Sequence, residues 1–354
     1  MTADAAPLAP PATLADFRRH ERRRRRWLWA GGAVLLLAGL ADLLVGPGHY
    51  AYREVLLALW RPAEADPVLR ITLWQIRLPT VLLAALSGAG LAVAGAQMQT
   101  VLDNPLADPF TLGLASAASF GAALAVVGGI ALLPLEGALG AAGNAFVFSL
   151  LAALMVQLLG QRRGTSLEVL VLLGIATMFT FNALLGLLQY VASPDALQQL
   201  VFWTLGSLSR ATPLKLAMIA LVLVACLAVS QRLGWQLSAL RLGDTQARAM
   251  GVRAARLRLG MLAAMALLTA VVVAAVGTIG FVGLVAPHMA RLLVGDAQRH
   301  FLPLSALLGA SLMCLADLVS KSALPGVVLP VGIITALTGL PIFFLLILRH
   351  RRLS

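Results

Sequence analysis

Residues 213–231 read PLKLAMIALVLVACLAVSQ and residues 257–276 read LRLGMLAAMALLTAVVVAAV, two long apolar blocks. Between them lies a polar stretch, GDTQARAMG at residues 243–251, and arginines continue after it as far as Arg258. An α-helix crosses the hydrocarbon core of a bilayer in about 20 residues. The pattern therefore predicts two transmembrane helices joined by a long charged loop outside the bilayer.

The composition of the whole chain favours the same interpretation. Hydrophobic residues make up 60% of the 354 positions, charged residues make up 12%, and the mean hydropathy is +0.90. Soluble globular domains are about half apolar and about one quarter charged. A soluble helical protein would also show one apolar stripe per helix rather than blocks that are apolar all round. We therefore expect an all-α polytopic membrane protein.

The apolar blocks predict about ten transmembrane helices in a single domain at residues 27–350. We expect them at residues 27–46, 78–102, 112–133, 138–159, 167–191, 213–231, 257–276, 281–294, 302–319 and 330–348. The eighth block is too short to cross a bilayer alone. Gly280, Gly283 and Pro287 there favour a broken or bent helix whose backbone is shielded by protein.

The distribution of basic residues predicts the topology. Residues 1–26 are expected to form a disordered basic tail before an uncleaved first helix, because no small-x-small cleavage site follows the first apolar run. Ten alternating helices place 20 of the 27 Lys and Arg residues on the side of the termini. Cytoplasmic loops are enriched in Lys and Arg, so both termini are predicted to lie in the cytoplasm, with the chain in a bacterial inner membrane. This topology accounts for the net charge of +12, and no nucleic-acid partner is expected.

The helix expected at 78–102 is rich in small residues. They are Ser87, Gly88, Gly90, Ala94, Gly95 and Ala96. Small residues let helix backbones approach each other closely in a membrane. Gln97 and Gln99 would be costly facing lipid, so they face either protein or a water-filled path. Both alternatives, packing with interhelical hydrogen bonds and lining of a pathway, remain open.

Residues 104–109 read Asn-Pro-Leu-Ala-Asp-Pro, a double-proline segment that no helix interior accommodates. It predicts a tight cytoplasmic turn. With Arg77-Leu78-Pro79 before it and Leu112-Gly113 after it, the segment resembles the signature of the FecCD-type permeases. These are the membrane subunits of ABC importers for iron-siderophores, haem and cobalamin.

The C-terminal half resembles the same family in the order and spacing of its motifs, so the resemblance covers about residues 70–350. The matching residues are Gly243-Asp244, Ala247-Arg248, Gly251-Val252, Gly280 to Val285, Pro287-His288, Arg291-Leu292, Leu302 to Ser305, Ala316-Asp317 and Leu329 to Ile333. The resemblance implies the type II ABC importer permease fold.

The resemblance also implies a role for the polar loop at about residues 235–258. In this family the loop between the sixth and seventh helices forms coupling helices that dock in a groove of a separate ATPase. Small residues there permit close contact, and charged residues supply orienting salt bridges at the rim. The small residues are Gly243, Ala247 and Gly251, and the charged residues are Asp244, Arg248 and Arg253. The alternative is a basic surface helix that contacts lipid headgroups.

On the outer side, Arg77 and Lys321 match basic positions that, in the family, meet acidic residues of a periplasmic substrate-binding protein. Asp317 stands four residues before Lys321, an order that favours pairing. The sequence departs from the family pattern at Thr80, a position often Arg, and at Val328, a position often Glu. The departures bear on how many of the family's docking contacts operate here.

Pro287 and His288 are interpreted as a structural bend. A metal-ligand role for His288 would need a His, Cys or carboxylate partner at ligand spacing, and the sequence has none there. We therefore expect no metal site. The candidates for packing or for lining a pathway are Gln97, Gln99, Asn104, Pro105, Pro287 and His288.

The sequence contains no P-loop, which requires Gly-Lys-Ser/Thr to hold phosphates, because its two lysines follow Leu214 and Ser320. We therefore expect a transport subunit without enzymatic activity or cofactor, with ATP and Mg bound by a partner ATPase. The expected assembly contains a second permease (an identical copy or a paralogue), two cytoplasmic ABC ATPases and a periplasmic substrate-binding protein.

The favoured function is import of an iron chelate, either siderophore-iron or haem. One alternative is cobalamin import by the same fold. Another is an ion-coupled secondary transporter, which would need carboxylates or histidines deep in the membrane. Asp42 and Asp317 are the acids well inside the predicted spans, and both lie towards the outer ends.

Overall fold

The computed structural model describes residues 14–46, 50–134, 137–162, 167–324 and 326–350. Within this part of the chain, seven helices are long and apolar enough to cross a membrane. They are α1 (Leu14–Leu44), the continuous helix formed by α3 (Pro67–Ile71), the π-helix η1 (Thr72–Arg77) and α4 (Leu78–Val101), then α6 (Gly137–Arg162), α7 (Leu167–Val191), α9 (Pro213–Arg232), α12 (Ala254–Val276) and α14 (Gln298–Ser322).

Three further apolar helices are shorter: α5 (Leu114–Val126), α13 (Val282–Val294) and α15 (Val331–His350). Together with the seven long helices they match the ten predicted spans in order, so the all-α polytopic fold is confirmed. The prediction at residues 112–133 was too long. The helix ends at Val126 because two glycines follow it, and Gly129 adopts a left-handed φ of 65°.

Four short helices lie outside these ten apolar helices: α2 (Tyr52–Trp60), α8 (Pro194–Thr204), α10 (Gly234–Leu240) and α11 (Asp244–Ala249). The residues at its N-terminus determine where α8 begins. The Ser193 hydroxyl caps the helix by accepting a hydrogen bond from the Ala196 amide, and Pro194 occupies the first helical turn. Thr212 and Pro213 start α9 in the same way.

The predicted N-terminal tail needs a correction. Helix α1 begins at Leu14, so residues 14–26 are helical, whereas residues 1–13 lie outside the described residues. Arginine is a good helix former, which lets the basic run continue the apolar helix. The extension is also held to the rest of the chain, because His300 Nε2 on α14 lies 3.1 Å from Glu21 Oε1.

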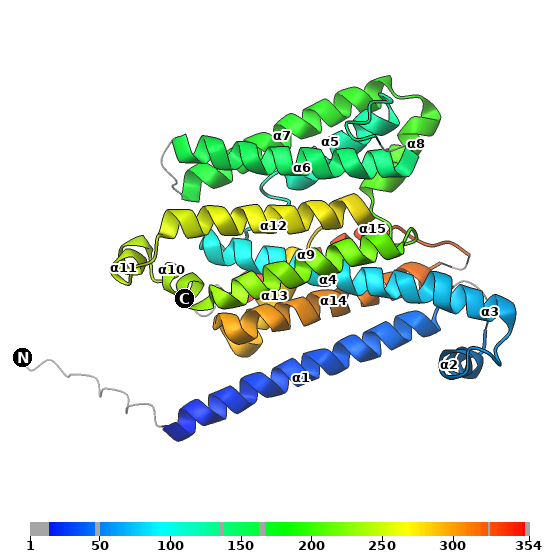
Figure 1. Ribbon diagram of the computed structural model, residues 1–354, viewed down its shortest axis with the longest axis horizontal. Coiled ribbons are helices and arrows are strands. Elements are labelled where there is room, and N and C mark those ends of the chain that lie inside the picture. Colours follow the sequence, from blue (N-terminus) through cyan, green and yellow to red (C-terminus); the bar gives the residue numbers. More distant parts are fainter. Residues whose placement is uncertain (1–13, 47–49, 135–136, 163–166, 325, 351–354) are drawn as a thin grey trace, which may run out of the picture.

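Helix α4 occupies the centre of the molecule, where it contacts α14, α12, α13 and α9. Helix α1 runs along α14 on one side, and α5, α6 and α7 form a layer on the other, with α6 packed on α12 (Figure 1). The central helix is also more buried than a helix of the outer layer. In the most apolar stretch of the α3–α4 helix 72% of the residues are buried, compared with 17% in that of α7.

Glycines allow the central helix to lie against its neighbours. A β-carbon on Gly88 would lie 2.2 Å from the Gly309 carbonyl oxygen of α14. A β-carbon on Gly95 would lie 1.9 Å from the Gly283 carbonyl oxygen of α13. Two of the small residues predicted to permit close packing, Gly88 and Gly95, are therefore in backbone-to-backbone contact.

The predicted broken or bent block at 281–294 is one helix, α13, with Pro287 inside it, and the irregular backbone lies before it, in the partly buried connection from α12. Ile279 within it is almost fully buried. Protein groups bind its polar atoms at two points, where the Ser207 amide donates to the Val276 carbonyl and the Thr278 hydroxyl donates to the Thr204 carbonyl. Non-helical backbone at membrane depth is tolerated only under such shielding.

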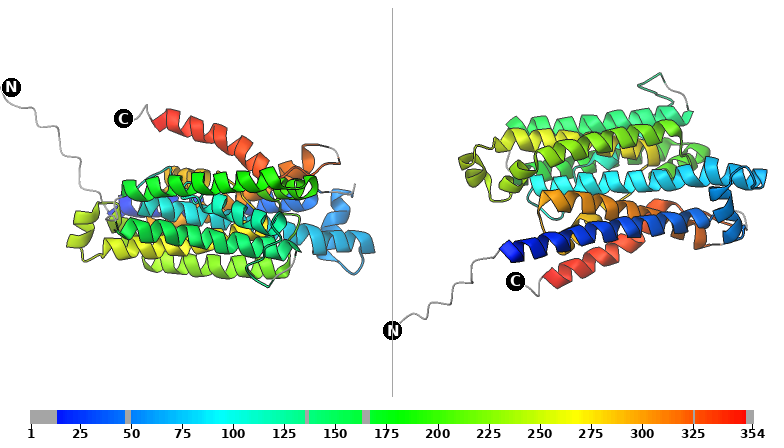
Figure 2. Two further views of the ribbon diagram at one scale, coloured as in Figure 1. Left: turned by 90° about the horizontal axis from the view of Figure 1, so that it is seen from above. Right: turned by 60° about the horizontal axis from the view of Figure 1, so that its bottom comes forward.

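The two ends of the molecule differ in what they carry. The start of α1, the end of α15 and the α10–α11 loop lie at one end, and α2, α3 and α8 lie at the other (Figures 1 and 2). We call these the loop end and the helix-cap end. The predicted topology, with both termini beside the polar loop, is compatible with this arrangement.

Candidate coupling loop and outer cavity

The polar loop between α9 and α12 folds into α10 and α11 at the loop end of the molecule (Figure 1). Gly243 precedes α11 with φ 96°, and Gly251 follows it with φ 81°. A β-carbon at either glycine would meet nothing within 4 Å. These glycines are therefore required by the turns at both ends of α11 rather than by close contact with a neighbour.

The other predicted coupling residues point in different directions. Ala247 is fully buried against this chain, so it is not available to a partner. Arg248 and Arg253 are exposed. Sequence reasoning missed two apolar side chains beside α11, Leu242 at 59% exposed and Met250 at 46% exposed. The available signal was that both are large apolar residues within a polar loop.

Asp244, with 39% of its side chain exposed, pairs on its outer side with Arg248 at 3.8 Å and on its inner side with Arg258. Arg258 Nη2 lies 3.0 Å from Asp244 Oδ1, and Arg258 Nη1 lies 3.4 Å from Asp244 Oδ2. The pKa of the Asp244 carboxyl is below its ordinary value, mainly because of the hydrogen bond from Arg258. Arg258 is 4% exposed, and its Nε donates a 3.0 Å hydrogen bond to the Val101 carbonyl of α4.

A second ion-pair cluster fixes the start of the same loop. Arg241, directly after α10, contacts the carboxylate of Asp296 in the α13–α14 turn. Arg291 Nε on α13 lies 2.7 Å from the same carboxylate oxygen. The loop is therefore attached to the helical body at Asp244 and at Arg241.

The inner end of α4 is joined to its neighbours by side-chain amides. Gln97 Nε2 donates to Gln298 Oε1 on α14 at 3.0 Å, and Gln298 Nε2 donates to the Thr100 hydroxyl at 3.1 Å. Gln99 Nε2 donates to the Gly283 carbonyl of α13 at 3.3 Å. Gln97 and Gln99 are therefore buried and make interhelical hydrogen bonds, which is the packing role rather than the lining of a pathway.

The double-proline turn after α4 brings a buried acid beside α13. Asn104 Oδ1 accepts a hydrogen bond from the Leu106 amide, and Pro105 is exposed at the turn. Asp108 is buried next to Gly283, where a β-carbon would lie 3.1 Å from Asp108 Oδ1. Burial raises the pKa of the Asp108 carboxyl to about 7.

Pro287 is buried within α13, and His288 beside it is half-buried. Neither lies among side chains suited to a metal. Within the described residues, no group of three or more His, Cys, Asp or Glu side chains could hold a metal ion.

The structure corrects the proposed docking role of Arg77 and Lys321, because both side chains are buried. Arg77 is 3% exposed, and its Nη1 donates to the Leu43 and Leu44 carbonyls at the end of α1. Lys321 Nζ lies 3.0 Å from Asp42 Oδ1 and also contacts Asp317 Oδ2. These cations join α1 to α4 and to α14 rather than facing a partner.

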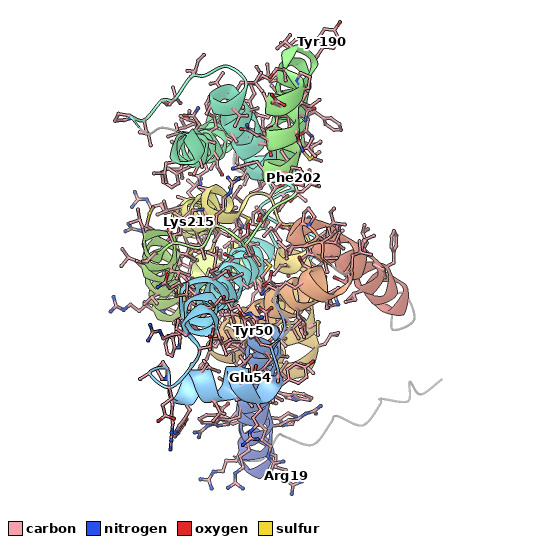
Figure 3. All side chains as sticks on the ribbon, turned by 90° about the vertical axis from the view of Figure 1, so that its right-hand side faces the viewer. Arg19, Tyr50, Glu54, Tyr190, Phe202 and Lys215 are labelled. Atoms are coloured by element: carbon pink, nitrogen blue, oxygen red, sulfur yellow. The ribbon has the colours of Figure 1, made fainter. Side chains whose placement is uncertain are left out.

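A cavity of about 1130 Å³ opens at the helix-cap end, and we call it the outer cavity. Much of its wall is glycine and alanine. Its polar lining consists of Gln198, Gln199, Ser207, Ser209, Arg210 and Lys215. The Lys215 ammonium donates to the Arg210 and Ala275 carbonyls, whereas the Arg210 side chain is exposed. Figure 3 views the molecule from this end and marks Phe202 and Lys215.

The amino-acid sequence matches the model of a known protein family. The model of the FecCD transport family matches residues 34–349. The chain belongs to this family. Accordingly it is an integral membrane protein and an ABC importer permease.

Relatives with different named cargoes are similar to it along almost their whole length. The molybdate import permease MolB of Haemophilus influenzae is 35% identical over 91% of this chain and 95% of MolB. The hemin transport permease HmuU of Yersinia pestis is 36% identical over 90% of this chain and 94% of HmuU. The vitamin B12 import permease BtuC of Klebsiella pneumoniae is 36% identical over 96% of this chain and 98% of BtuC.

A solved structure of an ABC transporter in an inward-facing conformation has the same fold. It aligns with a TM-score of 0.81 and 31% sequence identity, covering 92% of this chain and 99% of the other.

Proposed function

We propose that this chain imports an iron chelate across a bacterial inner membrane as the permease of a complex powered by a separate ATPase. The complex would contain a second permease, two ATPase subunits and a periplasmic substrate-binding protein. The observation that carries the proposal is the exposed face of the α11 loop, which projects at the loop end while ion pairs fix its base to the helical body.

The exposed face has the composition of a protein contact. Leu242 and Met250 are large, apolar and exposed, and Arg248, two residues before Met250, keeps 71% of its side chain exposed while its guanidinium lies 3.8 Å from Asp244. Methionine and arginine are enriched in protein interfaces relative to the rest of the surface. A lipid-contacting helix would instead be expected to present a continuous apolar face. We therefore assign the face to a partner protein, the ATPase.

The outer cavity supports an anionic chelate as cargo. Its volume of about 1130 Å³ lies just above the upper end of the range for small-molecule sites, about 300–1,000 Å³. Arg210 and Lys215 give it positive charge, and the described residues that line it include no Asp or Glu, whereas Glu136, next to the lining residue Gly137, lies outside the described residues. Haem carries two carboxylates, and many iron chelates are also anionic. Cobalamin import, the alternative, would make less use of these two cations.

The decisive experiment is uptake in proteoliposomes. We expect the purified chain to transport haem only when the ATPase and ATP are present on the loop side. Uptake driven by a proton or sodium gradient without the ATPase would support a secondary transporter instead.

Replacing Met250 with aspartate should weaken ATPase binding at least about tenfold, because burial of a methionine side chain contributes about 1.5–3 kcal/mol. Pull-down titration of the ATPase on the detergent-purified chain measures the affinity. Met250→Leu is the matched control and should bind normally. Equal affinity of the aspartate and leucine variants would remove Met250 from the interface.

Replacing Arg210 with glutamine should weaken haem binding about fivefold, the range of a solvent-accessible charge pair. The effect on cyanocobalamin should be smaller. Haem and cyanocobalamin titrations of the purified chain compare the two cargoes. Arg61→Gln changes another exposed arginine of the helix-cap end, one that faces Glu64 at 3.3 Å, and serves as the control. An equal loss for both cargoes would contradict the anionic assignment.

A further inference from the structure

Arg258 is the point at which three parts of the molecule meet. It lies in the first turns of α12, its two terminal nitrogens bind the carboxylate that begins α11, and its Nε binds the carbonyl of Val101. Val101 is the last residue of α4. The guanidinium therefore joins the coupling loop to the central helix of the fold.

We propose that Arg258 is the positioning residue that transmits movement of the α11 loop to α4. The proposal rests on the proposed function, since it supposes that an ATPase moves this loop. The proposal goes beyond that function because it names the contact through which movement of the loop reaches the membrane helices.

The chemistry of the contact makes it stiff. Arginine binds a carboxylate through two parallel N–H groups in a fixed plane, so the direction of the pair is set as well as its length. The Val101 carbonyl belongs to the last turn of α4, where carbonyl groups lack helical partners and carry partial negative charge. Because Arg258 is buried, water is poorly placed to replace either partner.

A displacement of the end of α4 can be transferred to the helices that contact it. Its last two turns are bound to α14 through Gln97 and Gln298, and to α13 through Gln99. Higher up, Gly88 and Gly95 place its backbone directly against the same two helices. A displacement of the α4 end is therefore resisted by tight packing and transferred to α13 and α14.

The ion-pair cluster of Arg241, Arg291 and Asp296 is a weaker candidate for transmitting movement of the loop. Asp296 is 43% exposed and binds Arg241 and Arg291, so it holds the start of the loop to the α13–α14 turn. Asp244 is exposed to a similar degree, 39%, but its partner Arg258 is only 5% exposed, compared with 29% for Arg241 and 19% for Arg291, so water competes least for the Arg258 guanidinium. This is why the inference is assigned to Arg258.

The test is the number of cargo molecules transported per ATP hydrolysed, measured with the full complex in proteoliposomes. Arg258→Gln should lower this ratio about tenfold, the factor expected for losing a hydrogen bond to a charged group, while ATPase binding and ATP hydrolysis persist. Arg256→Gln is the matched control, because Arg256 is an exposed arginine one half-turn earlier on α12. It should keep the normal ratio.

Further variants separate transmission from folding. Arg258→Lys retains the charge but cannot bind Asp244 and Val101 in the same geometry, so it should restore folding stability more than coupling. Asp244→Asn should lower the ratio like Arg258→Gln, and the double variant should be no worse than either alone. If Arg258→Gln does not assemble, Asp244→Asn decides, since that side chain is partly exposed and easier to replace.

An unchanged ratio in Asp244→Asn and Arg258→Gln would overturn the inference. Failure of the unaltered complex to transport with ATP would count against the proposed function instead. The two failures are thereby distinguished.

Discussion

Replacing Lys321 with methionine should destabilise the protein by about 3–5 kcal/mol, the cost of removing one partner from a buried ion pair. The change leaves Asp42, which is fully buried, facing Asp317 without the ammonium that lies between them. Two unbalanced carboxylates are especially costly in a membrane domain. Unfolding of the purified chain by heat or SDS, followed by tryptophan fluorescence, measures the loss.

The same three positions provide a control. Neutralising all three residues together, as Asp42→Asn, Asp317→Asn and Lys321→Met, removes the uncompensated charge and should recover most of the stability. If the single and triple variants unfold alike, the ion cluster does not hold α1 to α14. Neither variant alters the α11 loop, so ATPase binding by the folded fraction should be unaffected.

Lys321 also shows where the sequence was insufficient. Its spacing from Asp317 predicted a local pair, but Asp42 is 279 residues away in the chain, and no periodicity reveals that contact. Arg77 was misinterpreted for the same reason. A basic residue near the outer end of a helix has the same local sequence whether it faces a partner or binds the carbonyls of a neighbouring helix.

The number and order of the membrane helices could be predicted because apolar length is a property of each segment alone. The start of α1 at Leu14 could not, since arginines are compatible with both a helix and a tail. In the loop between α9 and α12, the sequence located the polar segment correctly. It could not separate inward Ala247 from outward Met250, because α11 has only six residues and too little periodicity to define a face.

Replacing Gly95 with alanine should destabilise the protein by about 3 kcal/mol, the upper part of the range for inserting a methyl group into a packed core. The new β-carbon would lie 1.9 Å from the Gly283 carbonyl oxygen, and that oxygen also accepts the hydrogen bond from Gln99. Neither backbone can yield without separating α4 from α13. We expect lower yield of folded protein and a lower unfolding midpoint in detergent.

Gly90→Ala is the matched control in the same helix, because its β-carbon would meet side-chain atoms, Val272 Cγ2 at 3.0 Å and Leu268 Cδ1 at 3.6 Å, rather than backbone. It should cost much less than Gly95→Ala. Equal unfolding midpoints for the two variants would show that α4 and α13 can move apart freely. That result would also weaken the proposed route from Arg258 through α4, since a loosely packed helix cannot carry a displacement to its neighbours.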